Sequence, residues 1–310
     1  MTDPQALRTE LRFAGAPPTG SQLESWRTVV AEMTAEIPDP GRVEVILTDR
    51  FARFAGEYLV RSVHRSNPDM TAADYQAQRV DGASAVAITI ELPDNRQAIV
   101  ASAGLLSEPG GVLRHAMLHE AQHVRMIQHG DPGYAVHRRV SSSTPFRLPD
   151  GGLAWEYVWM AGSSIDEFRA ERAMHERGWT VSATCVTPGD FAHIVDAFGR
   201  ASMVFRTSRD VRQAYQQSMA ALDRYAMYLA YAAAGIVTGA FTTRDWREVP
   251  ALTPFVDLLR DVPSPDTVVP AERLLPVALE QACLLQAGLK DRGFDYHQLP
   301  NDQGTYLTVL

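Results

Sequence analysis

The sequence predicts an α+β protein, in which a small sheet and one histidine-bearing helix precede a mostly α-helical C-terminal half. Two runs of β-branched residues flank a turn at residues 93–96, and apolar residues recur at helical spacing from residue 112 onward. A chain of 310 residues suits one large domain or two modest ones. We expect a first domain at residues 1–180 and a mainly helical domain or subdomain, packed on it, at residues 181–310.

Three segments make up the predicted sheet. Residues 42–48 partly alternate polar and apolar side chains, which is the pattern of a half-buried strand. Residues 85–92 and 97–102 are the two β-branched runs, and Pro93-Asp94-Asn95-Arg96 between them has the composition of a turn. These two runs are therefore expected to form a hairpin.

A helix is predicted at residues 112–129. Ser107, followed by Glu108 and Pro109, is a plausible start, although Gly110-Gly111 could delay the first turn, and Gly130-Asp131-Pro132 ends the helix. The apolar residues that recur at helical spacing are Val112, Leu113, Ala116, Met117, Val124 and Ile127. The segment therefore has a buried side.

The pattern His-Glu-x-x-His occupies residues 119–123 of this helix. Four residues turn a helix by about 400°, so His119 and His123 project from one face, one turn apart, and can bind one divalent cation. Glu120 flanks the same position and can take a proton from water on that cation. The alternative is a solvated helix that carries these residues by chance. It is disfavoured because a polar His-Glu pair among apolar neighbours would need other partners.

A second helix is predicted at residues 164–175, ending near Gly178. A catalytic zinc takes three protein ligands and keeps one open position, so this helix is expected to supply a third ligand. Glu167 is the first choice. Glu171 follows one turn later and can accept the free N–H of a ligand histidine, with His175 one turn beyond. We expect Arg169 and Arg172 on a solvated face.

Other interpretations of this helix remain open. Ser164 and Glu167 have the spacing of a capping box, in which case Glu171 or Glu156 would be the ligand. A di-iron site is a further alternative because Glu120-Ala121-Gln122-His123 is itself Glu-x-x-His and other carboxylates follow. A second Glu-x-x-His at the expected place is absent, and the predicted sheet argues against a pure helical bundle.

His-Glu-Ala-Gln-His at 119–123, followed by Glu-Phe-Arg-Ala-Glu at 167–171, resembles the gluzincin class of zinc metallopeptidases. Small ImmA-type and HtpX-type catalytic domains are the nearest comparison, and the resemblance covers about residues 85–178. It implies a zincin-like fold, with His119, His123 and Glu167 as Zn²⁺ ligands and Glu120 as general base. In such folds an exposed edge strand holds an extended peptide beside the metal. Glu171 stands where the pattern more often has aspartate.

The expected activity is metal-assisted hydrolysis of a peptide, a protein or a small amide-containing substrate. The alternative is a module that keeps the zincin fold and binds a partner without turnover. Candidate donors to the oxyanion are Tyr157, His175, His137 and Tyr225.

Bulk properties narrow the expected partners and compartment. The net charge of −8 speaks against a nucleic-acid partner. Cys185 and Cys283 are the only cysteines, which excludes a disulfide framework and a cysteine zinc site. The N-terminus lacks the pattern of a signal peptide, so we expect a cytoplasmic protein. Residues 225–243 carry no charge, but their Ala, Gly and Tyr content favours a buried helix over a membrane span.

The C-terminal half is expected to be mostly helical. The predicted helices lie at residues 188–197, 208–234, 253–259 and 271–289, and a short β-like tail follows at 305–310.

Overall fold

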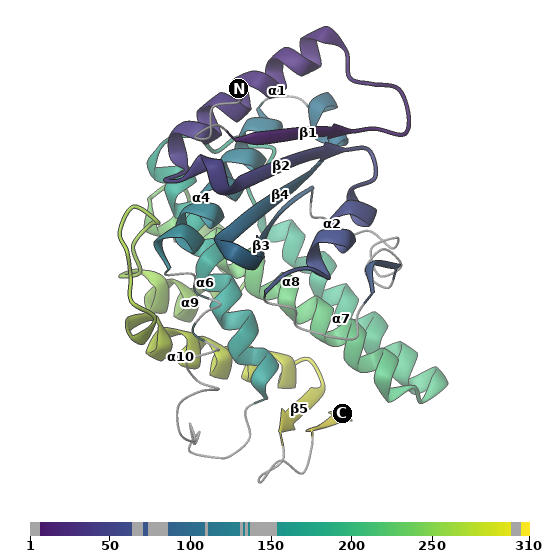
Figure 1. Ribbon diagram of the computed structural model, residues 1–310. Coiled ribbons are helices and arrows are strands. Elements are labelled where there is room, and N and C mark those ends of the chain that lie inside the picture. The colour runs from purple at the N-terminus through teal and green to yellow at the C-terminus, as the bar shows by residue number, and fades with distance from the viewer. Residues whose placement is uncertain are drawn as a thin grey trace. The chain divides into compact units, whose positions relative to one another are not determined.

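The computed structural model describes residues 7–63, 71–73, 86–108, 111–130, 133, 136, 154–298 and 305–310 (Figure 1). The chain forms two compact units. The first is Met1–Gly130 with Gly178–Thr184, and the second is Asp131–Arg177 with Cys185–Leu310. This division differs from the expected one at residue 180, because the helix at Trp155–Glu176 packs with the C-terminal helices.

The first unit is built on a four-stranded mixed sheet. Its strand order is β1-β2-β4-β3, with β2 parallel to β1 and β4, and with β3 antiparallel to β4 at one edge. The strands are β1 (Arg8–Arg12), β2 (Val43–Thr48), β3 (Ala87–Leu92) and β4 (Arg96–Ser102). The structure confirms the predicted strands at 42–48, 85–92 and 97–102, and the observed ends differ from the predicted ones by at most two residues. Ala85 lies outside the described residues. Strand β1 was not expected.

The turn between β3 and β4 explains why these strands pair as a hairpin. Pro93–Asn95 forms a short 3-10 turn, in which Asp94 and Asn95 have φ of 65° and 55°. Asp and Asn tolerate this left-handed conformation better than other residues with a Cβ. The antiparallel register that follows places Thr89 opposite Ile99.

Helices cover both faces of this sheet (Figure 1). Helix α2 (Phe51–Leu59) packs on β3 and β4, in a buried cluster that includes Ile90 and Val100. Thr89, the neighbour of Ile90, faces the opposite side because side chains alternate along a strand. Helix α4 (Val112–His129) lies on that side, and α1 (Gly20–Glu36) packs against α4.

The predicted bounds of α4 are confirmed at both ends. Gly111, with φ of 88°, precedes the helix, so the first helical residue is Val112. Gly130, with φ of 73°, ends it, and its N–H bonds to the carbonyl of Ile127. Glycine is suited to this left-handed cap because it lacks a Cβ.

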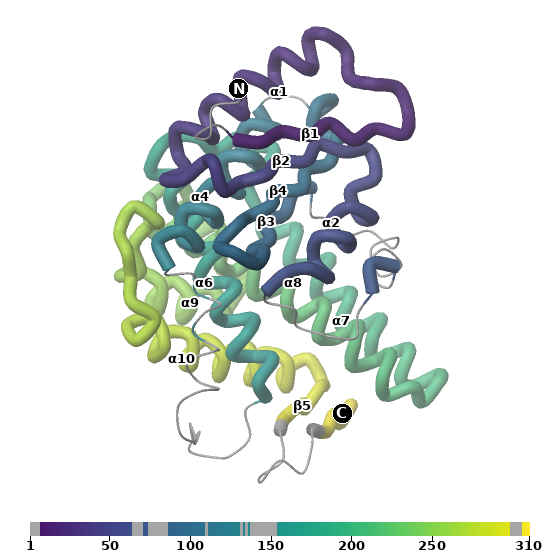
Figure 2. Tube along the Cα trace, in the orientation of Figure 1, coloured from purple at the N-terminus to yellow at the C-terminus, as the bar shows by residue number. Residues whose placement is uncertain are grey.

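The second unit is mainly helical. Its long helix α8 packs against α6, α7 and α9, while α10 packs on α6 (Figure 2). The helices are α6 (Trp155–Glu176), α7 (Pro188–Ser208), α8 (Val211–Val237), α9 (Leu252–Leu259) and α10 (Ala271–Lys290). The tail forms a two-stranded sheet of β5 (Phe294–Gln298) and β6 (Thr305–Val309). The expected α+β class with a mostly helical C-terminal half is therefore confirmed, although α7 extends well beyond residue 197.

Residues 225–243 fall mostly within α8, where Leu229 and Ala230 are fully buried in the core of the unit. Among the described helices, none combines the length and the apolar character that a membrane span requires.

Gly235 in α8 allows close packing against Phe241. A Cβ added at Gly235 would lie 2.2 Å from the ring of Phe241, which itself meets the His175 ring edge to face, with centroids 5.5 Å apart. Gly235→Ala is therefore expected to lower the free energy of unfolding by about 1–3 kcal/mol, despite the better helix propensity of alanine. Gly199→Ala in α7 is the control, since nothing lies within 4 Å of its added Cβ. That variant should stabilise by about 0.5–1 kcal/mol. Denaturant unfolding measures both, and equal effects would contradict this account of Gly235.

Candidate metal centre

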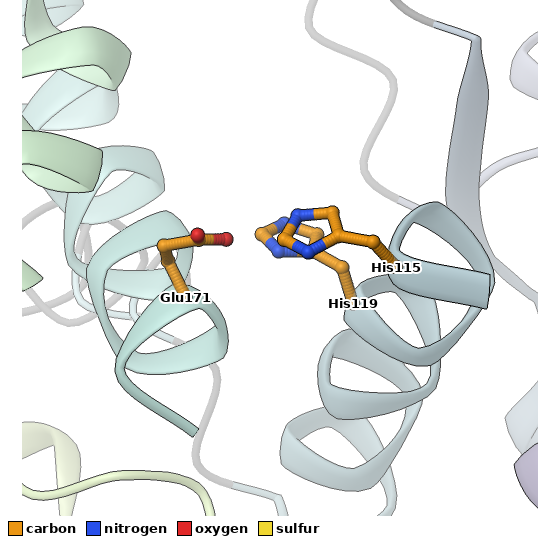
Figure 3. A group of neighbouring side chains, drawn as sticks. All are labelled: His115, His119 and Glu171. Atoms are coloured by element: carbon orange, nitrogen blue, oxygen red, sulfur yellow. The ribbon is translucent and has the colours of Figure 1, made fainter. Parts of the chain in front are cut away.

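Three histidines occupy successive turns of α4. Figure 3 shows the rings of His115 and His119 on the same side of the helix, and their centroids lie 6.2 Å apart. The Nε2 atoms of His119 and His123 are 3.1 Å apart. His115 and His119 are buried, and His123 is partly exposed. The predicted shared face of His119 and His123 is confirmed.

Contacts at both ends of α4 hold the helix in place. Arg114 and Glu32 of α1 form an ion pair at 2.5 Å. Near the other end, the Gln128 amide donates to the Gln97 side chain of β4 at 2.9 Å and to the backbone carbonyl of Asp39 at 3.0 Å. The histidines therefore project from a helix that is attached to both α1 and the sheet.

Glu120 lies between α4 and the edge strand β3. The Thr89 hydroxyl donates to Glu120 Oε2 at 2.7 Å and lies 3.1 Å from the Glu120 carbonyl oxygen. Only 9 % of Glu120 is exposed, so this hydrogen bond to a charged acceptor forms with little competition from water. Thr89 was not expected as a site residue. The strand prediction did place it on β3, but a single sequence does not show which helix residue it faces.

Helix α6 begins nine residues earlier than the sequence predicted. Ser164 lies in its interior, and its hydroxyl donates to the Ala161 carbonyl at 2.9 Å. The capping-box interpretation of Ser164 and Glu167 is therefore wrong. Arg169, expected on a solvated face, is fully buried and donates to the carbonyls of Pro263 and Thr267.

Glu167 and Glu171 stand one turn apart on α6, and each has a partner within the second unit. The Tyr231 hydroxyl of α8 donates to Glu167 Oε2 at 2.7 Å. Glu171, shown extending from α6 in Figure 3, has its Oε1 atom 3.5 Å from His175 Nε2. The side chains of Glu171 and His175 are both buried. Burial is the main cause that raises the pKa of the Cys185 thiol, and the negative charge of Glu171 adds to it.

The other candidates serve the core of the second unit. Glu156 accepts hydrogen bonds from the hydroxyls of Tyr215 and Tyr296 at 3.3 and 2.6 Å. Tyr157 is fully buried and donates to the Tyr296 carbonyl at 2.9 Å. Burial raises the pKa of Tyr157, with the charges of Asp295 and Glu156 adding to the effect. Glu156 and Tyr157 therefore join α6 to β5.

Two further oxyanion candidates differ in how they are placed. Tyr225 is buried, and its ring packs against Phe191 and under the Arg292 guanidinium, 4.2 Å from the ring centroid. His137 lies outside the described residues. Tyr231 was not expected as a site residue, because its partner Glu167 lies 64 residues earlier in the chain.

Two groups of histidine and glutamate side chains among the described residues could hold a metal ion. They are His119, His123 and Glu167, and His115, His119 and Glu171. In each group the histidines would offer a ring nitrogen and the glutamate a carboxylate oxygen, which are ligand types that suit Zn²⁺.

Comparison with known proteins identified no relative. No family model matches the chain, and neither a curated protein nor a solved structure matches it. Proposals about function therefore rest on the residues and contacts of this chain and on the motif resemblance of residues 119–123 and 167–171.

Proposed function

We propose that the protein is a zinc-dependent metallopeptidase or a related amide hydrolase. The geometry of α4 carries this proposal. Two nitrogens that bind one zinc at about 2.0–2.1 Å in tetrahedral geometry lie roughly 3.3 Å apart. The Nε2 atoms of His119 and His123 are 3.1 Å apart. Both imidazoles can therefore bind one ion with little movement of either ring.

The proposal assigns the third ligand to Glu167. Its hydrogen bond from Tyr231 holds Oε2 and orients the carboxylate, as partners of metal ligands commonly do. Glu171, itself positioned by His175, is proposed to accept the free N–H of His119.

Glu120 is the proposed general base. A bound zinc supplies Lewis acidity and lowers the pKa of water at its open position. Glu120 accepts the proton of the attacking water and later delivers it to the leaving nitrogen. The hydrogen bond from Thr89 holds Glu120 Oε2 on the side of β3. That bond restrains the rotation of the carboxylate.

A peptide is the favoured substrate class because β3 is an edge strand beside the general base. Among the described residues, no strand of this sheet lies beyond β3, and of its outward-facing main-chain groups the Glu91 carbonyl accepts from the N–H of Val63 at 3.2 Å. Main-chain groups on such an edge can pair with an extended peptide. Thr89 of β3 contacts Glu120, so a peptide along this edge would run close to the base.

The test is hydrolysis of a peptide library by the full-length chain. We expect cleavage that a zinc chelator abolishes and added Zn²⁺ restores. Binding of zinc without cleavage of any peptide would contradict the peptidase and favour a module that binds partners without turnover. Two iron ions per chain in place of zinc would contradict the proposed chemistry altogether.

Thr89→Val is expected to lower kcat by about 10- to 100-fold, since hydrogen bonds to charged groups contribute about 1.5–3 kcal/mol. The replacement keeps the shape of the side chain but removes the donor to Glu120. Thr89→Ser keeps the hydroxyl and should retain most of the activity. Zinc content should be the same in both variants. An unchanged kcat in Thr89→Val would show that this bond does not position the base.

A further inference from the structure

The end of the hairpin formed by α7 and α8 carries an exposed basic and apolar surface. Helix α7 ends at Ser208, Arg209 turns the chain with φ of 58°, and α8 begins at Val211. The two helices run side by side to this end (Figures 1 and 2). The tip surface consists of Arg200, Met203, Arg206, Arg209, Val211 and Arg212, all of which are exposed.

The charge of the tip surface is opposite to that of the whole chain. Four arginines fall within residues 200–212, and Asp210 is the one acid of that segment, whereas the chain has a net charge of −8. Asp210 is engaged as the cap of α8, where it accepts from the N–H of Gln213 at 2.9 Å. Among the described residues, no carboxylate lies within ion-pair distance of the four arginines. The tip surface is therefore a local cluster of positive charge.

Apolar side chains lie between these charges at helical spacing. Met203 is 60 % exposed and Val211 is 47 % exposed, so both offer apolar surface at the tip. Val195, 50 % exposed, and Gly199 precede Met203 by two turns and one turn on the same face of α7. Arg206 continues this stripe toward the tip, and Asp196 and Arg200 lie beside it. At the tip itself, Met203 and Val211 lie among arginines, which matches the complementary face of an acidic amphipathic helix.

We propose that the tip surface binds an acidic, amphipathic segment of a partner protein. Arginine pairs with carboxylates through two parallel hydrogen bonds, and methionine adapts to varied apolar surfaces. Both residue types are enriched in protein interfaces. The tip surface lacks the exposed aromatic rings that bind single-stranded nucleic acid, and its two apolar side chains would insert little area into a membrane.

This docking surface lies apart from the proposed ligands of the second unit. Arg212 and Tyr231, which holds Glu167, are both in α8 and are separated by about 28 Å along its axis. A partner on the tip surface would therefore leave Glu167 and Tyr231 uncovered. The inference does not depend on the proposed hydrolase activity.

The experiment measures the binding of a synthetic helical peptide of glutamate and leucine to the full chain by fluorescence anisotropy. The variant R200E/R206E/R209E/R212E should weaken binding at least about tenfold, because each exposed pair contributes about twofold in affinity. The matched control R27E/R42E/R53E/R260E changes the net charge equally, at arginines that already pair with carboxylates of this chain. That control should change the affinity less than about threefold. High salt should weaken binding to the native chain.

Met203→Ser and the single change Arg206→Glu test the surface if the fourfold variant does not fold. Each should weaken binding by about twofold to fivefold, as expected for one exposed contact. Equal losses in both fourfold variants, or no saturable binding, would overturn the proposal. Tighter binding of phosphatidylglycerol vesicles or of single-stranded RNA at the same arginines would overturn it as well, by assigning the surface to another class of partner.

Discussion

Glu120→Gln is expected to reduce hydrolysis by about 100- to 10,000-fold while zinc stays bound. Glutamine cannot accept the proton of the attacking water, and removal of a positioned general base commonly has this effect. The Glu120 side chain is not among the proposed ligands, so the metal content should not change. Thr89 can still donate to the glutamine carbonyl oxygen, which preserves the contact to β3. Initial rates on the best library peptide and elemental analysis of the same sample measure the two quantities.

Glu57→Gln in α2 is the control for this prediction. Glu57 pairs with Arg53 at 2.9 Å on the other face of the sheet, so its loss should leave the rate unchanged. Full activity in Glu120→Gln would refute the assignment of the base. Loss of zinc together with retained activity would refute the role of the metal as well.

Replacement of the proposed ligands is expected to give graded losses of zinc affinity. Glu167→Ala and His123→Ala should each weaken zinc binding by more than about 100-fold, since loss of a ligand exceeds the 10- to 100-fold effect of losing a group that orients one. Glu171→Gln should fall within that 10- to 100-fold range. Competition with a chromogenic chelator measures all three affinities.

Glu176→Gln is the matched control on the same helix. Glu176 pairs with Arg172 at 2.7 Å, one turn after Arg172 in α6, and should not affect zinc. A larger loss in Glu171→Gln than in Glu167→Ala would exchange the roles of these two acids. The second candidate group, His115, His119 and Glu171, would then be the metal site.

The sequence predicted α4 well because local signals agree there. Apolar spacing marks its buried side, and glycines stand at both ends, where the structure has left-handed φ values. The hairpin of β3 and β4 was predicted for the same reason, since Asp94 and Asn95 suit the turn between two β-branched runs. These features depend on neighbours in the chain.

The start of α6 could not be predicted because that helix is buried on most of its sides. Its polar residues find partners far along the chain, as Arg169 does with the carbonyls of Pro263 and Thr267. A helix with a buried arginine has no clear amphipathic pattern, so only its second half was recognised. Ser164 then suggested a cap, although its hydroxyl bonds to the preceding turn.

The hydrogen-bond partners of the candidate site residues could also not be predicted from the sequence. Thr89 and Glu120 are 31 residues apart, and Tyr231 and Glu167 are 64 residues apart. Such pairs are set by tertiary packing, which spacing within one sequence does not reveal. Strand β1 was missed for a similar reason, because its short polar sequence becomes a strand only by pairing with β2.

Anomalous diffraction at the zinc edge from crystals grown with Zn²⁺ tests the central claim most directly. We expect one peak at about 2.0–2.1 Å from the Nε2 atoms of both His119 and His123, and at about 2.0–2.2 Å from a carboxylate oxygen of Glu167. A peak elsewhere, or no peak with these three side chains pointing apart, would contradict the proposed metal centre and the hydrolase with it.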